Sequence, residues 1–337
     1  MKEKISVIIP VLDFKECGVP VEVIKNNKYI EEIIIVKGKQ PSIQRNEATK
    51  IARGEILYFL DNDSIPDLNN FERIIKFFEL HKDASVIGGP SLMSEDDKGF
   101  SFAVGTALSS FLGSAFSSAR YNSKGNERLS DEKELILCNM AFKKKIFKEF
   151  GMFNTNLYPN EENELLNRIK KNDGEIWYLP NLVVYRGHRR NIFALIKQIF
   201  RYGRGRAEEF FIDKKFPLFA VISLFFDLFL CFSIINFSFL SKIILIFYLT
   251  ILILFSFYKT LSKKKIFLLI YLPIIFFIIH SIYGIGFLWG LIKKIIKSEK
   301  KFTSGQIIKK TKKGKIIFLE VELISKRSLA HKSWHRY

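Results

Sequence analysis

Two carboxylates two positions apart, Asp61 and Asp63, directly follow the apolar run ILYFL of residues 56–60. In an extended chain the side chains of residues i and i+2 point to the same side. The two carboxylates would therefore repel each other unless a cation lay between them. Carboxylate oxygens suit Mg²⁺ or Mn²⁺ and leave coordination positions for phosphate oxygens. The alternative is a turn, in which Asp61 and Asp63 cap the chain around Ser64-Ile65-Pro66. The pair by itself is compatible with both.

A second acidic cluster reads Asn160-Glu161-Glu162-Asn163-Glu164. Leu165, Leu166 and Ile169 follow at helical spacing, which places the acids in the first turn of a helix. Acids at this position complement the helix dipole. They could also supply a general base, because a helix N-terminus favours an ionised carboxylate near neutral pH. Both interpretations remain open at this point.

The segments around these acids alternate between strand-like and helix-like patterns. Buried strands are predicted for residues 5–11, 31–38, 56–60 and 84–90, and amphipathic helices for 44–55 and 68–82. Alternation at this spacing predicts βαβ units and an α/β domain with a mainly parallel sheet flanked by helices. In such sheets ligands bind beyond the carboxyl ends of the strands, where Asp61 and Asp63 lie.

The composition changes after Lys214. The chain is 48% hydrophobic yet carries a formal charge of +19, a combination typical of membrane proteins with basic flanks. Residues 216–237, 239–258 and 266–292 are each apolar and long enough to cross or enter a bilayer. Three full crossings would leave the Lys-rich tail outside, against the positive-inside rule. Either the third segment doubles back at Pro273 or the tail breaks the rule.

The scattered cysteines, Cys17, Cys138 and Cys231, suggest neither a zinc site nor a disulfide framework. The basic charge flanks apolar spans and does not interleave with aromatic residues on a soluble face, so we expect no nucleic-acid partner. The first apolar run is too short for a signal peptide, which predicts a cytoplasmic catalytic domain on a multi-pass cell-membrane protein.

The order ISVIIPV, then QRNEATKIARGEILYFLDNDSIPD, resembles the family-2 glycosyltransferases of the GT-A fold over residues 4–210. The typical sequence motif of this family is VIIP, followed by ARN-x-G-x3-A-x-GE-x3-FLD-x-D. The resemblance implies a nucleotide-diphosphate sugar donor, Asp61 facing its sugar or ribose, and Asp63 ligating a Mn²⁺ or Mg²⁺ ion at its diphosphate. The implied donor-binding residues are Pro10, Val11, Arg45, Asn46, Asp61, Asn62, Asp63, Asn139, Gln198, Arg201 and Tyr202.

Two later blocks extend the resemblance. The segment 135–185 is similar to the family's G-x-N-x-AFRR and ED-x-D/E-L text, which puts Glu162 in the place of the inverting base and Glu161 beside it. The motif Gln198-x-x-Arg201-Tyr202 resembles Q-x-x-RYG-x-G of membrane-bound, succinoglycan-type relatives. The segment that carries this motif is predicted to be a basic, amphipathic helix that lies at the membrane surface. His188 is a candidate third metal ligand, and a lone surface histidine is the alternative.

One departure concerns the turn after the second strand. The family usually has an Asp-rich turn there, whereas this chain has Lys37-Gly38-Lys39-Gln40. Either lysine could contact phosphate, or the segment could be a solvated turn. The departure is the main support for the alternative of a catalytically inactive membrane scaffold.

The expected organisation has four parts. They are a GT-A catalytic domain (1–185), basic interfacial helices (186–214), a transmembrane region of two to three segments (215–292) and a basic tail (293–337). We expect an inverting hexosyltransferase acting on a polyprenyl-type lipid-linked or glycan acceptor, in contact with membrane lipids, in surface polysaccharide or glycoconjugate synthesis.

Overall fold

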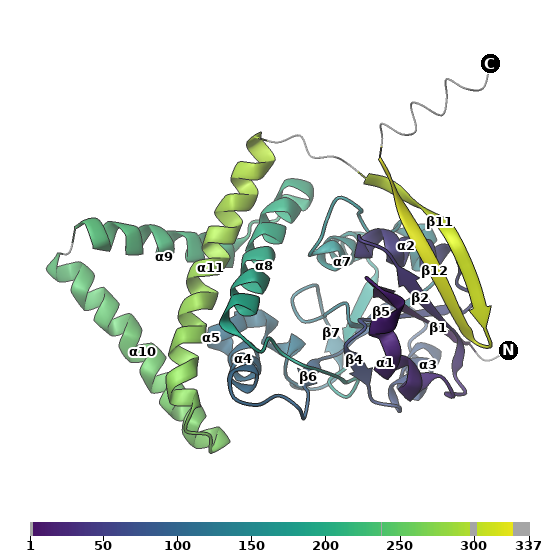
Figure 1. Ribbon diagram of the computed structural model, residues 1–337, viewed down its shortest axis with the longest axis horizontal. Helices are drawn as coiled ribbons and strands as arrows, with labels where there is room; N and C mark the ends of the chain where they lie inside the picture. The colour runs from purple at the N-terminus through teal and green to yellow at the C-terminus, as the bar shows by residue number, and fades with distance from the viewer. Residues whose placement is uncertain (1–2, 237, 297–301, 326–337) are drawn as a thin grey trace. The chain divides into compact units, whose positions relative to one another are not determined.

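A computed structural model describes residues 3–236, 238–296 and 302–325 of the chain (Figure 1). The chain forms two compact units. Of the described residues, the first unit contains 3–92, 119–186 and 302–325, and the second contains 93–118, 187–236 and 238–296. The chain therefore leaves the first unit twice and returns to it twice.

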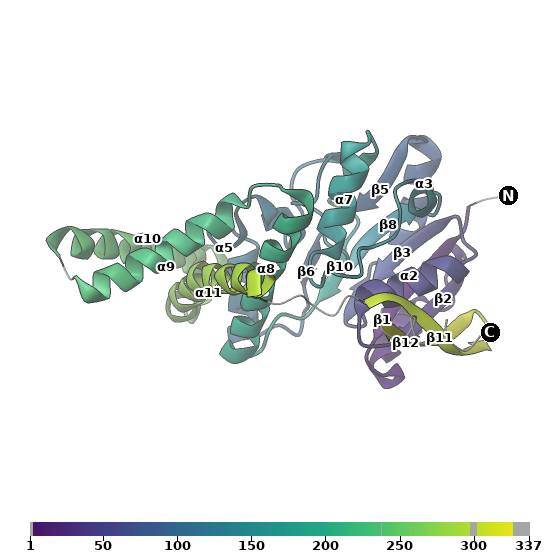
Figure 2. The ribbon, with the colours of Figure 1, turned by 90° about the horizontal axis from the view of Figure 1, so that it is seen from above.

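The first unit is built on a nine-stranded sheet in the order β11-β12-β2-β1-β3-β8-β5-β9-β7 (Figures 1 and 2). Its strands are β1 (Ile5–Val11), β2 (Ile30–Lys37), β3 (Ile56–Leu60), β5 (Ala84–Gly88), β7 (Arg128–Leu129), β8 (Asn139–Lys143), β9 (Glu175–Tyr178), β11 (Phe302–Lys313) and β12 (Ile316–Ser325). A smaller sheet has the order β4-β10-β6, with β4 (Ser64–Pro66), β6 (Ser91–Met93) and β10 (Val184–Arg186).

The predicted strands and helices of the N-terminal half are confirmed, with ends shifted by a few residues. β1 pairs in parallel with both β2 and β3, and all five residues of β3 are buried. The helices of this unit are η1 (Phe14–Cys17), α1 (Gly18–Ile24), α2 (Pro41–Ile51), α3 (Asn70–Leu80), α6 (Ile146–Glu149) and α7 (Glu161–Lys171). Two apolar clusters form the core and contain alternate residues of β1, as expected for a sheet buried on both faces.

The sheet is mixed rather than mainly parallel, because β8 runs antiparallel between β3 and β5. This arrangement was not visible in the sequence, since a buried run such as NMAFK carries no information on strand direction. The parallel strands β2, β1 and β3 still place their carboxyl ends at one edge, as the strand pattern predicts.

The C-terminal hairpin of β11 and β12 belongs to the same sheet. β12 pairs in parallel with β2 along residues 316–320 and 33–37, and Ile317, Leu319 and Val321 are buried. The sequence analysis assigns these residues to a basic tail, whereas the structure places them in the sheet between β11 and β2. The hairpin covers the apolar edge that β2 would otherwise expose. The rest of the predicted tail after Ile296, residues 297–301 and 326–337, lies outside the described residues.

The second unit is helical. Its helices are α4 (Phe100–Leu108), α5 (Phe111–Ser114), α8 (Ile192–Asp213), α9 (Leu218–Ile235), α10 (Phe239–Lys263) and α11 (Leu268–Ile296), and η2 (Ala115–Arg120) connects it to the first unit. In the described part of the chain α9, α10 and α11 are long and apolar enough to cross a membrane. The predicted apolar C-terminal region is therefore confirmed as helical.

Candidate active site

Asp61 and Asp63 lie directly after the carboxyl end of β3. The backbone N–H of Ser64 donates a 3.1 Å hydrogen bond to the carbonyl of Asp61, which closes a tight turn before β4 begins. The side chain of Asp61 is 24% exposed and that of Asp63 is 46% exposed. Both predicted features are thus present together, since the acids form a turn and also present carboxylates at the strand end.

Arg186, the last residue of β10, bridges the two aspartates. Its Nη1 lies 3.1 Å from Oδ2 of Asp61, and its Nε lies 2.8 Å from Oδ1 of Asp63. The antiparallel register of β4 and β10 sets this geometry, because Arg186 is opposite Ser64, the neighbour of Asp63. The sequence analysis did not assign Arg186 to the site. The sequence feature that could have indicated Arg186 as a site residue is its position at the end of the apolar run LVVYR.

Arg45 of α2 makes a second bridge. Its Nη1 donates a 2.7 Å hydrogen bond to Glu161, and its Nη2 donates a 3.0 Å hydrogen bond to Asp61. The side chains of Arg45 and Glu161 are only 6% and 3% exposed. The acids and arginines therefore alternate in one chain of contacts, Glu161–Arg45–Asp61–Arg186–Asp63, which joins α7, α2, the end of β3 and β10.

Glu161 has a strongly shifted proton affinity. Burial raises its pKa from the ordinary value of 4.5 to about 7, the negative charge of Glu162 adds to the rise, and Arg45 opposes it. Burial thus outweighs the favourable helix N-terminus at this position. The expectation of a fully ionised acid at neutral pH does not hold for Glu161.

Glu162 differs from both neighbouring glutamates. Its side chain is half-buried, and none of the residues that the structure describes donates a hydrogen bond to it or forms an ion pair with it. Glu164, by contrast, accepts two hydrogen bonds from Arg168, at 3.1 and 2.8 Å, on the same helix. Glu164 therefore has a structural partner, whereas the carboxylate of Glu162 is available to a ligand.

The two aspartates fit the predicted divalent ion. Their oxygens already share one cationic group, the guanidinium of Arg186, and hard carboxylate oxygens are the ligands that Mg²⁺ and Mn²⁺ favour. In the described part of the chain, no three His, Cys, Asp or Glu side chains converge into a complete metal site. Asp61 and Asp63 would thus supply only part of the coordination, which leaves positions for diphosphate oxygens and water.

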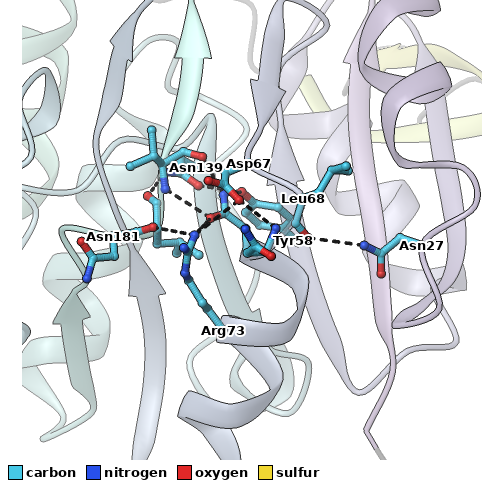
Figure 3. Close-up of polar contacts among 11 residues, drawn as sticks. Asn27, Tyr58, Asp67, Leu68, Arg73, Asn139 and Asn181 are labelled. Atoms are coloured by element: carbon cyan, nitrogen blue, oxygen red, sulfur yellow. Dashed lines mark hydrogen bonds and ion pairs between the residues drawn. The ribbon is translucent and has the colours of Figure 1, made fainter.

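Two predicted donor-binding residues have hydrogen-bond partners within the protein. Asn139 is fully buried, accepts a 2.7 Å hydrogen bond from the hydroxyl of Tyr58 and donates to the carbonyls of Pro90 and Leu182 at 3.0 and 2.6 Å (Figure 3). Asn46 exchanges hydrogen bonds of 2.8 and 3.0 Å with the backbone of Phe153. Both amides hold elements together, and a donor contact by either remains a prediction.

Three further predicted residues lie near the ends of β1 and β3. The carbonyl of Val11 accepts hydrogen bonds from Gln44 and from the N–H of Gly38, at 2.9 and 3.1 Å, and Pro10 precedes it. The Asn62 amide donates a 3.3 Å hydrogen bond to Glu16. Both strand ends are at the same edge of the sheet, which is consistent with the predicted donor site.

Lys37 forms an ion pair of 2.9 Å with Glu320 of β12. The hydrogen bond from Lys37 to Glu320 raises the pKa of the lysine above its ordinary value. Neither interpretation offered for the Lys37-Gly38-Lys39 turn included this contact. The lysine at the end of β2 has a structural role because it anchors the C-terminal hairpin.

The remaining predicted residues belong to the second unit. The backbone N–H of His188 donates to both carboxylate oxygens of Asp97, at 3.1 and 3.2 Å, and its Nδ1 lies 3.4 Å from Asp97 Oδ2. Burial alone would raise the pKa of Asp97, but the hydrogen bonds from His188 hold it below its ordinary value. A metal-ligand role for His188 remains a prediction.

The motif on α8 is partly bonded within itself. The Gln198 amide donates a 2.8 Å hydrogen bond to the hydroxyl of Tyr202, and Arg189 donates one of 3.1 Å to Gln198. The Arg201 side chain is exposed. Contacts of these three motif residues with a donor remain predictions.

Residues 3–205 match the sequence model of the family described as "Glycosyltransferase like family 2". The chain belongs to this family. The match spans the strands from β1 to β10, the aspartate pair, the glutamates of α7 and the motif on α8. This family-2 glycosyltransferase has no match among the curated proteins.

Two solved structures are similar to this chain. The mannosyltransferase PcManGT from Pyrobaculum calidifontis, in complex with GDP-Man and Mn²⁺, is 13% identical, with 86% of this chain and 88% of that chain covered and a TM-score of 0.51. TarS from S. aureus, in complex with UDP-GlcNAc, is 14% identical, with 69% and 74% covered and a TM-score of 0.43. At 13% identity the likeness to the mannosyltransferase concerns the fold alone. Together with the family match, it confirms the predicted GT-A catalytic fold, which apolar helices follow in the chain.

Proposed function

We propose that the protein is a membrane-attached, inverting glycosyltransferase. It moves a hexose-type sugar from a nucleotide-diphosphate donor to a lipid-linked or glycan acceptor, in surface polysaccharide or glycoconjugate synthesis. The observation that carries this proposal is the contact chain from Asp63 to Glu161, which ends beside the half-buried carboxylate of Glu162. It combines a cation-binding end with an acidic end.

The cation-binding end would hold the donor diphosphate. Asp61 and Asp63 would ligate Mn²⁺ or Mg²⁺, which when bound offsets the charge of the departing diphosphate. PcManGT, which shares the fold, was solved with GDP-Man and Mn²⁺, and this supports a divalent ion here. Arg186 would turn from the aspartates toward the diphosphate, where a guanidinium can form two parallel hydrogen bonds to phosphate oxygens.

The acidic end would activate the acceptor. The acceptor hydroxyl oxygen forms the new bond to C1 of the sugar, and its proton passes to a carboxylate oxygen of Glu162. The bond from C1 to the diphosphate oxygen breaks on the opposite side, so the configuration at C1 inverts. Arg45 holds Glu161 next to this base in the first turn of α7.

The helical unit would bring the enzyme to a lipid-linked acceptor. α8 combines basic residues with an apolar face, as in helices that lie at a membrane surface. Its exposed Arg201 could pair with a phosphate of a polyprenyl-type acceptor. α9, α10 and α11 supply the apolar surface for attachment, with the catalytic unit in the cytoplasm.

A donor screen on the detergent-purified full-length protein tests the proposal. Nucleotide-diphosphate sugars, GDP-Man among them, are supplied with Mn²⁺ or with EDTA, and with a polyprenyl phosphate or a glycan as acceptor. We expect metal-dependent release of nucleoside diphosphate and a product of inverted anomeric configuration. A donor that binds but never turns over with either acceptor would instead support the inactive scaffold.

A further inference from the structure

The segment 187–296 lies between two strands of the same compact unit, β10 of the smaller sheet before it and β11 of the nine-stranded sheet after it. β10 ends at Arg186, and β11 begins at Phe302 and pairs with β12, which joins β2 of the nine-stranded sheet. The pairing of β12 with β2 is anchored by buried apolar residues and by the Lys37–Glu320 ion pair. A folded sheet with charged surfaces lies on one side of a bilayer, because unpaired strands and charges are not stable in the hydrocarbon core.

We infer from this that the chain crosses the membrane an even number of times, and that the crossing pair is α9 and α10. The inference rests on the membrane attachment proposed above and specifies its topology. α11, although long and apolar enough to cross, remains on the side of the catalytic sheet. Among the described residues three helices qualify for crossing by length and composition, and an odd number of crossings would separate β12 from β2.

Charge along the sequence supports the pair α9 and α10. Lysines flank the outer ends of the pair and the start of α11, whereas Lys242 alone lies near the short connection at residues 236–238. The flanking lysines are Lys214, Lys215, Lys259, Lys263, Lys264 and Lys265. Basic residues favour the cytoplasmic side, which places both outer ends of the pair there and its tip across the bilayer.

The lengths are sufficient for this path. α9 has 18 residues and α10 has 25, which correspond to about 27 and about 37 Å of helix, against about 30 Å of hydrocarbon core. The tip carries Asn236 and Ser238, polar residues suited to the far interface. Within the most apolar stretch of each helix, only 11% of α9 and 17% of α10 is buried by protein, so lipid would cover most of both.

α11 differs from this pair in its packing. Protein buries 44% of its most apolar stretch, and basic residues stand at both of its ends, Lys265 before it and Lys293 and Lys294 in its last turn. It contacts α9 near Ser223 and α10 at Phe255, in the halves of those helices next to the basic ends, and also at Tyr248 further along α10.

α11 packs most closely against α8, a charged helix that cannot cross a bilayer. A Cβ atom at Gly286 would lie 2.3 Å from the carbonyl of Phe200, and one at Gly203 would lie 2.1 Å from the carbonyl of Tyr283, so the two backbones touch. α8 carries the ion pairs Arg204–Glu208 and Arg206–Glu209 along this stretch. A helix in backbone contact with such a charged helix belongs at the membrane surface.

The same reasoning applies to residues 93–118, the other segment that belongs to the helical unit. It also leaves and re-enters the catalytic unit, and its two helical pieces, 100–108 and 111–120, are bent by 80° at their junction. Although the pair together is apolar enough for a span, a single crossing would again split the catalytic unit. This segment therefore enters and leaves on the catalytic side.

Single-cysteine labelling of the full-length chain in bacterial spheroplasts tests the topology. Native Cys17 and Cys231 are replaced by Ser and buried Cys138 by Ala, and one cysteine is introduced as Asn236→Cys, Thr311→Cys or Lys50→Cys, all at exposed positions. With a membrane-impermeant maleimide we expect Asn236→Cys to react in intact spheroplasts. Thr311→Cys and the catalytic-domain control Lys50→Cys should react only after the membrane is opened.

Two labelling results would overturn the inference. One is reaction of Thr311→Cys in intact spheroplasts while Lys50→Cys is protected, which means an odd number of crossings. The other is protection of Asn236→Cys together with Lys50→Cys until the membrane is opened, which means that residue 236 is on the same side as the catalytic domain and the α9–α10 pair does not cross. Should the cysteine-free background fail to fold, the native chain fused at its C-terminus to green fluorescent protein or alkaline phosphatase reports the side of the tail. Fluorescence without phosphatase activity is expected, and the reverse contradicts the inference.

Failure of the proposed function gives different results. Recovery of the native chain in the aqueous fraction without detergent would remove the membrane attachment itself. Reaction of both Lys50→Cys and Thr311→Cys in intact spheroplasts, with Asn236→Cys protected, would keep the even count and reverse only the proposed cytoplasmic orientation.

Discussion

Arg45 of α2 donates a 2.7 Å hydrogen bond to Glu161 of α7, a residue 116 positions away in the chain. Both side chains are almost completely buried, and the second Nη of Arg45 reaches Asp61. Removal of one partner from such a pair leaves a buried charge and typically costs about 3–5 kcal/mol. The pair therefore fixes the first turn of α7, and Glu162 with it, relative to the strand-end aspartates.

The shifted pKa of Glu161 predicts a pH-dependent stability. Because its folded-state pKa is raised from 4.5 to about 7, the folded protein binds the proton more tightly than the unfolded chain. The resulting stabilisation is fully present below pH 4.5 and is lost as pH rises through 7. We expect the difference in melting temperature between wild type and Glu161→Gln to change steadily between pH 5 and pH 8, in favour of wild type at the acid end. Glu149→Gln serves as control, and equal pH profiles for wild type and Glu161→Gln would contradict the assignment.

Asp63→Asn should abolish transfer and metal-dependent nucleotide binding together. A site with two protein carboxylates loses one of its charged ligands, so affinity for Mn²⁺ and for the diphosphate should fall jointly. Binding of a nucleoside diphosphate is measured by calorimetry with and without Mn²⁺. Asp96→Asn, at an exposed position, should behave as wild type. Unchanged Mn²⁺-dependent binding by Asp63→Asn would exclude Asp63 as a ligand.

Arg186→Met should have opposite effects on two ligands. Without the guanidinium, the carboxylates of Asp61 and Asp63 lose their shared counter-charge, so Mn²⁺ alone should bind more tightly. The nucleoside diphosphate should bind more weakly, because a phosphate partner is lost. Mn²⁺ titration followed by electron paramagnetic resonance gives the first affinity, and calorimetry gives the second. The matched control is Arg190→Met, an exposed arginine of the second unit. A parallel loss of both affinities would mean that Arg186 only supports the fold.

Leu319→Ala tests whether the C-terminal hairpin is part of the catalytic sheet. Leu319 is fully buried in β12, and a buried Leu→Ala substitution costs about 2–5 kcal/mol. We expect a clearly lower melting temperature for the first unit in the detergent-purified full chain. Ile308→Ala on β11 is the control, because Ile308 is 54% exposed and should cost little. Equal melting temperatures for the two variants would show that β12 is not docked on β2.

Much of the catalytic fold could be predicted because its signals are local. The apolar runs of β1 and β3 and the helical spacing after Glu164 lie within short windows of sequence. Asp61 and Asp63 could be found because they follow a strand directly. The direction of β8 and the docking of β12 depend on contacts between residues that are far apart in the chain, and Lys37 gave no sign that its partner is Glu320.

The contacts that the two arginines make with the acids of the site could not be predicted from the sequence for the same reason. Arg45 was assigned from the resemblance, but its two acidic partners lie just after β3 and in α7 and are known only from the fold. Arg186 reaches Asp63 because β10 pairs with β4, two short strands without a pattern of their own. The structural use of Asn46 and Asn139 was likewise hidden, since a buried amide with internal partners and a ligand-binding amide look alike in sequence.

Glu162→Gln separates the structural and catalytic interpretations of the acids on α7. Glutamine keeps the size and hydrogen bonding of the side chain but cannot accept the acceptor's proton. An acid that only complements the helix dipole would lose about 0.3–1 kcal/mol of stability and leave turnover nearly unchanged. A general base should instead cost about 10²–10⁴-fold in kcat, with donor affinity retained. We expect the second result, because Glu162 is half-buried and the described residues offer its carboxylate no partner.

Glu161→Gln is measured in parallel, and its smaller loss of turnover should follow from the changed contact with Arg45. Near wild-type turnover in Glu162→Gln would remove it as the base, and a larger loss in Glu161→Gln would transfer the role to Glu161.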